Sequence, residues 1–317
     1  MYYVGVDLGG TNIAIGIVDE EFNIVLKDKV PTIAGRPSDE IIKDMADLIK
    51  SLVERTGISF DDIAYVGIAA PGTVDPANGV VKYCNNIKMF HYPIAEELMK
   101  RIPVKKVYLE NDANAAALAE AKAGAGKGKQ DVIMITLGTG LGGGIVIGGK
   151  LYTGFNYVGA EIGHMAIEHG GRPCTCGRKG CWEAYSSATG LINITKDKLR
   201  ETKDTIMWDM VEGDIDRVSG RTAFNAARQG DKAGQEVVDM YIDYLAYGMT
   251  NIVNVFQPEV FCIGGGVCGE GDYLLKPLAK LVDEQQYGTH SHDDKTEIKI
   301  AVLGNDAGII GAALLGE

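Results

Sequence analysis

Residues 2–18, YYVGVDLGGTNIAIGIV, contain two apolar runs rich in β-branched residues on either side of a short glycine turn. Such runs favour strands, and the glycines between them permit a tight reversal, so the stretch predicts a hairpin. Residues 22–30 add a third run, which extends the hairpin to a meander. A helix with apolar residues on one face at 39–55 and a further strand at 63–69 then predict an α/β domain.

The same strand–glycine turn–strand device returns at 132–147, VIMITLGTGLGGGIVI, with residues 138–144 as the turn. Two halves of the chain that begin with the same strand–turn–strand pattern indicate an internal duplication. Glycine and lysine replace alanine at 122–130, which marks the expected domain joint. Between and after the hairpins we expect strands at 104–109, 260–263 and 297–303, and helices at 113–124, 232–256, 274–286 and 307–315, with mixed helical segments from 188 to about 230.

Size and composition exclude several classes of protein. The chain has 317 residues, 46% of them hydrophobic and 23% charged, which suits a two-domain globular protein. Its net charge of −12, without a lysine or arginine run, argues against nucleic-acid or anionic-membrane partners. We find no signal peptide and no apolar segment of membrane-spanning length. Six cysteines are too few for a disulfide framework, so we expect a reducing cytoplasm.

Residues 161–183, EIGHMAIEHGGRPCTCGRKGCWE, gather four metal-ligand side chains in one short loop. His164, Cys174, Cys176 and Cys181 form a Cys₃His set, which suits tetrahedral zinc. Four protein ligands leave no open position for water, so the sequence predicts a structural metal. The alternative is three unrelated thiols and a histidine. Glu161 and Glu183 bracket the loop, so a bound metal would hold these two carboxylates at defined places, and the alternative is that they are ordinary surface charge.

Three glycine-rich loops are candidates for binding phosphate through backbone amides, although a tight hairpin needs glycine in any case. The first two connect strand to strand, which removes the context of a dinucleotide fingerprint, and a Walker ending is absent. Asp7, at the end of a strand, suits Mg²⁺ held through water, or it is a turn aspartate. The loops are Gly9-Gly10-Thr11, Gly138-Thr139-Gly140 and Gly264-Gly265-Gly266.

Asp112 stands just before an alanine-rich helix, where amides at the helix N-terminus favour an ionised carboxylate. It is therefore a candidate general base that is ready at neutral pH. The competing interpretation is that Asp112 or Asn111 only caps the helix, which is a common use of these residues.

Taken together, five motifs resemble the ROK family of sugar kinases, and within it the bacterial glucokinases, over essentially the whole chain. The resemblance implies a two-domain actin-like ATPase (ribonuclease H-like) fold, with duplicated β-meander/α units and an interdomain cleft. We expect a smaller domain at 1–121 plus about 304–317, and a larger one at 122–303 that carries the zinc loop. The motifs are DLGGTN at 7–12, LENDANAAALAE at 109–120, LGTGLGGG at 137–144, EIGHM at 161–165 and CTCGRKGCWE at 174–183.

The resemblance implies transfer of the ATP γ-phosphate to a hexose, with glucose to glucose 6-phosphate as the expected reaction. Asp112 would be the catalytic base, and ATP, Mg²⁺ and structural Zn²⁺ would be the cofactors. His164 would serve both zinc and sugar. The implied sugar ligands are Asn86, Asn111, Asp112, Glu161, His164 and Glu183, and the implied nucleotide-binding residues are Asp7, Gly9, Gly10, Thr11, Asn12, Gly138, Thr139, Gly140, Gly264, Gly265 and Gly266.

Two positions depart from the family pattern: Asn12 stands where lysine is frequent, and Phe90 where many glucokinases have tryptophan. The substrate stays open among glucose, N-acetylmannosamine, N-acetylglucosamine, fructose and allose. A sugar-sensing repressor is disfavoured because Asp7 lies too near the start for a preceding helix-turn-helix, and polyphosphate as donor is disfavoured by the lack of a basic cluster. Family likeness implies a homodimer or homotetramer.

Overall fold

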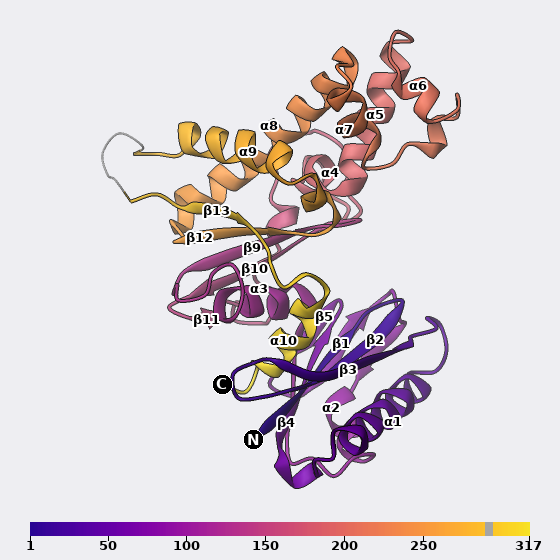
Figure 1. Ribbon diagram of the computed structural model, residues 1–317, viewed down its shortest axis with the longest axis vertical. Helices are drawn as coiled ribbons and strands as arrows, with labels where there is room; N and C mark the ends of the chain where they lie inside the picture. Colours follow the sequence, from indigo (N-terminus) through magenta and orange to yellow (C-terminus); the bar gives the residue numbers. More distant parts are fainter. Residues whose placement is uncertain (289–293) are drawn as a thin grey trace. The chain divides into compact units, whose positions relative to one another are not determined.

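The computed structural model describes residues 1–288 and 294–317 and forms an α/β protein (Figure 1). It divides into two compact units. Unit 1 comprises Met1–Val132, Gly144–Ala160 and Val302–Glu317, and unit 2 comprises Ile133–Gly143 and Glu161–Ala301. This division places residues 122–132 and 144–160 with the first unit, whereas we expected them in the larger domain. The predicted domain boundaries remain a proposal, since compactness is a different criterion.

The first sheet has the order β3-β2-β1-β4-β8. The meander is antiparallel, and β1, β4 and β8 run parallel. Helix α1 (Ser38–Thr56) buries the predicted apolar face, including Met45, Ile49 and Leu52, against this sheet's core. The strands are β1 (Tyr2–Leu8), β2 (Asn12–Val18), β3 (Ile24–Pro31), β4 (Ile63–Ala70) and β8 (Val107–Asn111).

The second sheet has the order β11-β10-β9-β12-β13, which repeats the order of the first sheet strand for strand. The predicted duplication and the actin-like α/β class are therefore confirmed. The strands are β9 (Val132–Leu137), β10 (Leu141–Ile147), β11 (Lys150–Leu151), β12 (Val260–Gly264) and β13 (Glu297–Ile300).

The glycine run 142–144 belongs to strand β10 and not to the turn, so the expected turn at 138–144 is too long. The reason is close packing against helix α3 (Asp112–Lys122). A Cβ atom added at Gly144 would lie 2.4 Å from Cβ of Ala117 and 2.9 Å from the Ala113 carbonyl oxygen. Glycine here is a packing requirement, and local sequence does not distinguish that from a turn.

Helix α3 is held by alanine-rich contacts within unit 1. Ala69 of β4, Ala115 of α3 and Ala312 of α10 (Ala307–Ala313) form one buried cluster. Leu118 and Ile310 belong to a neighbouring cluster on the same two helices. Small side chains let the helices approach closely, which fixes the N-terminus of α3 at the end of β8.

A small sheet of β5 (Thr73–Asp75), β6 (Val80–Cys84) and β7 (Met89–Tyr92), followed by α2 (Ile94–Met99), was not predicted. Its strands are too short to show a clear period. The remaining helices are α4 (Glu183–Ser186), α5 (Ala188–Glu201), α6 (Met207–Met210), α7 (Thr222–Arg228), α8 (Lys232–Phe256) and α9 (Asp272–Gln285), with short 3₁₀ turns at Phe60–Asp62, Ile162–His164, Ile215–Arg217, Gly266–Glu270 and Gly304–Asp306.

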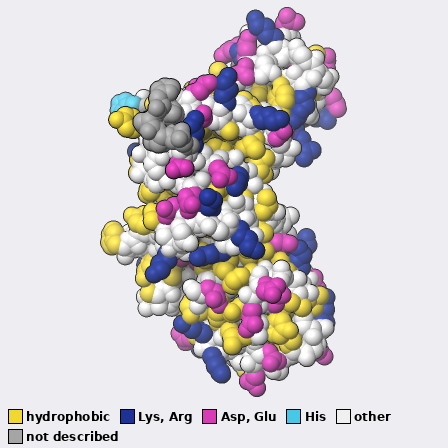
Figure 2. Space-filling view, turned by 60° about the vertical axis from the view of Figure 1, so that its left-hand side comes forward, with side chains coloured by type: hydrophobic (Ala, Val, Ile, Leu, Met, Phe, Trp, Pro, Cys, Tyr) yellow, Lys and Arg dark blue, Asp and Glu magenta, His cyan; other side chains and the backbone are white. Residues whose placement is uncertain are grey.

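Basic and acidic side chains are intermixed on the face that Figure 2 shows, as 31 basic and 43 acidic residues in the chain lead us to expect. Among residues 1–288 and 294–317, no helix combines the length and the apolar character needed to cross a membrane.

Candidate functional site

Asn111 and Asp112 lie where strand β8 passes into helix α3. Asn111 is the N-cap: its Oδ1 accepts the N–H groups of Ala113 at 2.9 Å and Asn114 at 3.2 Å. Its Nδ2 donates to the Gly72 carbonyl oxygen at 3.1 Å. The capping interpretation is therefore correct for Asn111. Asp112 is the first residue of the helix, so its carboxylate is not needed as the cap.

The Asp112 side chain is exposed at the protein surface, yet neighbouring protein atoms partly desolvate its carboxylate. This desolvation raises the pKa of Asp112, while the Ala113 N–H, 2.8 Å from Oδ1, acts in the opposite direction. The helix amides favour the ionised form, as we expected, but the larger effect of desolvation was not part of that expectation. A raised pKa makes the carboxylate a stronger base once it is ionised.

Asp7 is the penultimate residue of strand β1 in unit 1 and is partly buried. Burial, and then the negative charge of Asp112, raise the pKa of Asp7 to about 6 from its ordinary value of 3.8. The coupling indicates that these two carboxylates lie near one another. Two partly desolvated carboxylates favour a cation between or beside them, which suits the predicted Mg²⁺.

Replacing Asp7 with asparagine is expected to stabilise the free protein. Because the folded-state pKa lies above the unfolded one, the destabilisation by Asp7 is absent below about pH 4, grows between about pH 4 and pH 6, and is complete above. At pH 8 the gain in unfolding free energy is up to about 3 kcal/mol, at ~1.4 kcal/mol per pKa unit. Urea unfolding at pH 8 and pH 4 measures it; an equal change at both pH values would contradict the argument.

The first glycine turn is closed by its own backbone. The Gly9 N–H donates to the Asn12 carbonyl oxygen at 2.9 Å, so Gly10 and Thr11 are the remaining amides of this turn. Thr32, which is fully buried, holds the turn in place through two hydrogen bonds. Its Oγ1 donates to the Gly9 carbonyl oxygen at 2.6 Å, and its backbone N–H donates to the Thr11 carbonyl oxygen at 2.8 Å. Asn86, in the β6–β7 connection, lies beside Gly10, because a Cβ at Gly10 would be 3.9 Å from the Asn86 Cβ.

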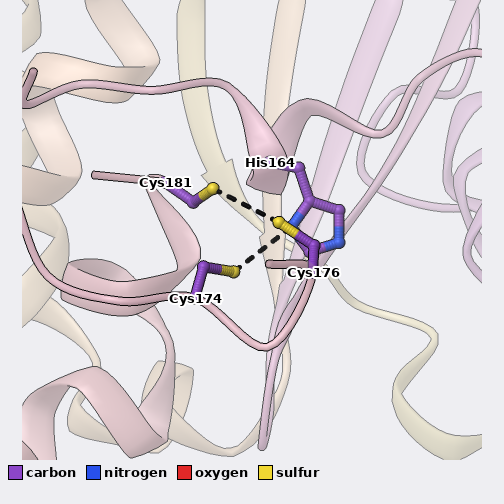
Figure 3. A group of neighbouring side chains, drawn as sticks. All are labelled: His164, Cys174, Cys176 and Cys181. Carbon is purple, nitrogen blue, oxygen red and sulfur yellow. Dashed lines mark hydrogen bonds between the residues drawn. The ribbon is translucent and has the colours of Figure 1, made fainter. Parts of the chain in front are cut away.

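The four predicted metal ligands of unit 2 converge. Figure 3 shows His164, Cys174, Cys176 and Cys181 pointing toward one another. Their ligand atoms all lie within 4.8 Å of each other. Cys174 Sγ is 3.6 Å from Nδ1 of His164, and Cys176 Sγ is 3.6 Å from Sγ of Cys181.

These separations match the edges of a zinc tetrahedron. Zn–S bonds of about 2.3 Å and Zn–N bonds of about 2.05 Å place neighbouring ligand atoms about 3.5–3.8 Å apart. A disulfide would require about 2.05 Å, and none of the six cysteines, all of which lie in the described part of the chain, is joined in a disulfide. Burial raises the pKa of Cys181 to about 12, so a cation is needed to hold its sulfur as a thiolate. The residues therefore fit structural zinc.

Glu183 connects this cluster to the second glycine turn. One oxygen, Oε1, accepts from Cys174 Sγ at 3.6 Å, and the other, Oε2, accepts the Leu141 N–H at 2.9 Å. A Cβ at position 140 would lie 2.4 Å from Oε2 of Glu183, so any larger residue there would displace this carboxylate. Glu161 lies exposed at the start of the turn that carries His164.

The second glycine turn resembles the first, since the Gly138 N–H donates to the Gly140 carbonyl at 3.0 Å. Helix α5 holds it: the Ala188 N–H donates to the Gly138 carbonyl at 2.9 Å and Thr189 Oγ1 to that of Thr139 at 2.7 Å. A 420 Å³ cavity borders Thr139, Gly140 and Glu183. Gly264 ends β12 and is followed by Gly265 and Gly266 at the start of a 3₁₀ turn.

Unit 1 thus brings together Asp7, Asp112, Asn86 and the first glycine turn, and unit 2 brings together the metal cluster, Glu183 and the second. Phe90 is half exposed, with its ring 5.5 Å from that of Tyr83. Sequence reasoning missed Thr32 and Thr189, because nothing local marks a threonine whose partner lies 23 or 50 residues away.

Comparisons with known proteins agree with this arrangement. The sequence pattern described as the ROK family matches residues 3–317. The chain is 37% identical to the glucokinase of Thermotoga maritima, over 98% of this chain and 95% of that protein. It is 38% identical to the glucokinase of Streptomyces coelicolor, over 99% and 97% respectively.

Among solved structures, a ROK family glucokinase from Streptomyces griseus in complex with glucose and AMPPNP is similar, with a TM-score of 0.79 and 36% identity. The alignment covers 99% of this chain and 98% of that one.

Proposed function

The chain belongs to the ROK family, and from this premise we propose that it transfers the γ-phosphate of ATP to the 6-hydroxyl of glucose. The observation that carries the proposal is the full-length relationship to glucokinases, together with Asp112 at the start of helix α3. It is an ATP-dependent sugar kinase. The roles assigned below to single residues are part of the proposal.

Asp112 accepts the proton of the attacking hydroxyl as the oxygen–phosphorus bond forms. The N-cap at Asn111 and the bond from the Ala113 N–H hold the carboxylate in one direction, so little reorganisation is needed during reaction. Phosphoryl transfer needs positioning and charge neutralisation more than covalent chemistry, and a base of raised pKa suits it.

The sugar hydroxyls are bound by Asn86, Asn111, Glu161, His164 and Glu183. The Nδ1 atom of His164 faces Cys174, which leaves Nε2 for a hydroxyl. Glu183 already accepts a backbone N–H through Oε2, so the second glycine turn and the sugar ligand are fixed together. A site of this kind rejects sugars that lack a hydroxyl, since a carboxylate would lose its partner.

The nucleotide phosphates are bound by the two glycine turns, with Asp7, Thr11 and Asn12 at the first and Thr139 at the second. Gly264–Gly266 contact the adenosine. Asp7 would hold Mg²⁺, which would supply positive charge to neutralise the phosphates. His164, Cys174, Cys176 and Cys181 would hold the zinc that fixes the loop carrying the sugar ligands.

A hexose panel with Mg·ATP tests this function. We expect glucose to give the highest kcat/KM, at least about tenfold above N-acetylmannosamine, N-acetylglucosamine, fructose and allose. One polar contact in such a site discriminates by more than this factor. A coupled ADP-release assay measures it, and omission of the sugar is the control. A different preferred hexose would keep the kinase and correct the substrate, whereas transfer to no sugar would overturn the proposal.

We also propose a homodimer or homotetramer in the cytoplasm. The oligomeric state rests on the family relationship, and the location rests on six cysteines of which none is joined in a disulfide, which suits a reducing compartment.

A further inference from the structure

Glu110 is a buried carboxylate to which the mechanism above gives no role. It is the penultimate residue of strand β8 and is only 6% exposed. Its Oε1 accepts the Asn111 N–H at 2.8 Å and Nδ2 of Asn114 at 3.0 Å. A buried carboxylate without hydrogen-bond donors would destabilise the protein, and these two bonds offset that cost for Glu110.

The two donors lie on either side of Asp112 in the sequence. Asn111 is the helix N-cap, and Asn114, 4% exposed, belongs to the first turn. The Oδ1 atom of Asn114 has no hydrogen-bond partner among the described residues, so the bond to Glu110 is what orients this amide. One oxygen of Glu110 therefore joins the end of β8 to the first turn of α3.

We propose that Glu110 is a positioning residue, which fixes the direction of the Asp112 carboxylate by holding the strand-to-helix junction from both sides. This inference rests on the proposed function and deepens it. The physical basis is that a misplacement of about 1 Å at the reacting group costs up to about 10²-fold in rate. The role requires an acceptor oxygen at a given reach and does not require negative charge.

Two conservative variants separate reach from charge. Glu110→Gln keeps the length and an acceptor oxygen but removes the charge, and its kcat should stay within about threefold of wild type. Glu110→Asp keeps the charge but is one methylene shorter, so kcat should fall about 10- to 100-fold. The glucose Kd, measured by calorimetry, should change by less than about threefold in both variants.

Glu120 supplies a matched control on the same helix. It is fully buried, and its carboxylate accepts the N–H groups of Ala125 and Leu303, each at 2.8 Å, at the end of α3 remote in sequence from Asp112. Glu120→Asp should lower the melting temperature but keep kcat per folded molecule within about threefold. Should Glu110→Asp fail to fold, Asn114→Ala removes one donor to Glu110 and should lower kcat about tenfold.

Three results would overturn the role of Glu110: an unchanged kcat in Glu110→Asp, an equal loss in Glu110→Gln, or an equal loss in Glu120→Asp. These are judged against an active wild type. A wild type that phosphorylates no hexose would instead overturn the proposed function, and this inference with it.

Discussion

Replacement of Asp112 by asparagine is expected to lower kcat for glucose by roughly 10²- to 10⁴-fold, the range of general-base assistance. Asparagine has nearly the same shape and keeps an oxygen that accepts the Ala113 N–H, so the start of helix α3 should stay folded. It cannot take a proton at neutral pH. The glucose Kd should therefore change by less than about threefold while turnover is lost, which a calorimetric titration and a coupled assay measure together.

The pH profile gives this prediction a second measurement. Because the pKa of Asp112 is raised by burial, the base is protonated at a pH above the ordinary range of aspartate. Activity of the wild type should fall as pH decreases through this raised pKa, and the residual activity of Asp112→Asn should lack that limb.

Asp61→Asn is the matched control, since Asp61 is exposed in the 3₁₀ turn Phe60–Asp62 and should give wild-type kinetics. Activity of Asp112→Asn within tenfold of wild type would remove Asp112 from its role.

The elements that sequence predicted well are those with a long or repeated pattern. The bounds of α8 agree with the helix expected at 232–256, and β2 and β9 lie within the apolar runs expected at 2–18 and 132–147, because runs of β-branched residues and a 25-residue apolar periodicity are local signals. The small sheet from β5 to β7 was missed because its strands are only three to five residues long. The strand expected at 297–303 ends at Ile300, as the chain turns toward Gly304.

The site divides in the same way. Cys174, Cys176, Cys181 and His164 were predicted as a cluster because rare side chains at short spacing are themselves the signal. The sequence did not predict that the pKa of Asp112 is raised, because this shift depends on how much protein surrounds the carboxylate. Glu110 was not singled out because its role appears only in distances to backbone and amide groups that any helix start contains.

Loss of one zinc ligand should act on sugar affinity more than on the chemical step. In Cys176→Ser, three ligands remain, and we expect zinc content to fall well below one equivalent. Glu183 contacts Cys174 and also holds the Leu141 N–H, so a loosened cluster releases both the sugar ligand and the second glycine turn. The KM for glucose should rise at least about tenfold, because the carboxylate must then be ordered on binding. Metal analysis and glucose titration of the purified variant measure the two effects.

Cys262→Ala is the appropriate control, because Cys262 is fully buried in strand β12 and outside the cluster. Its zinc content should match that of wild type, and its KM for glucose should change by less than about twofold. Wild type treated with a chelator that is removed before Mg·ATP is added should reproduce the KM of Cys176→Ser, and restored zinc should reverse the change, because the zinc that we propose holds the loop and takes no part in proton transfer. Wild-type protein purified without zinc but with full glucose affinity would show that the four ligands hold the loop by themselves.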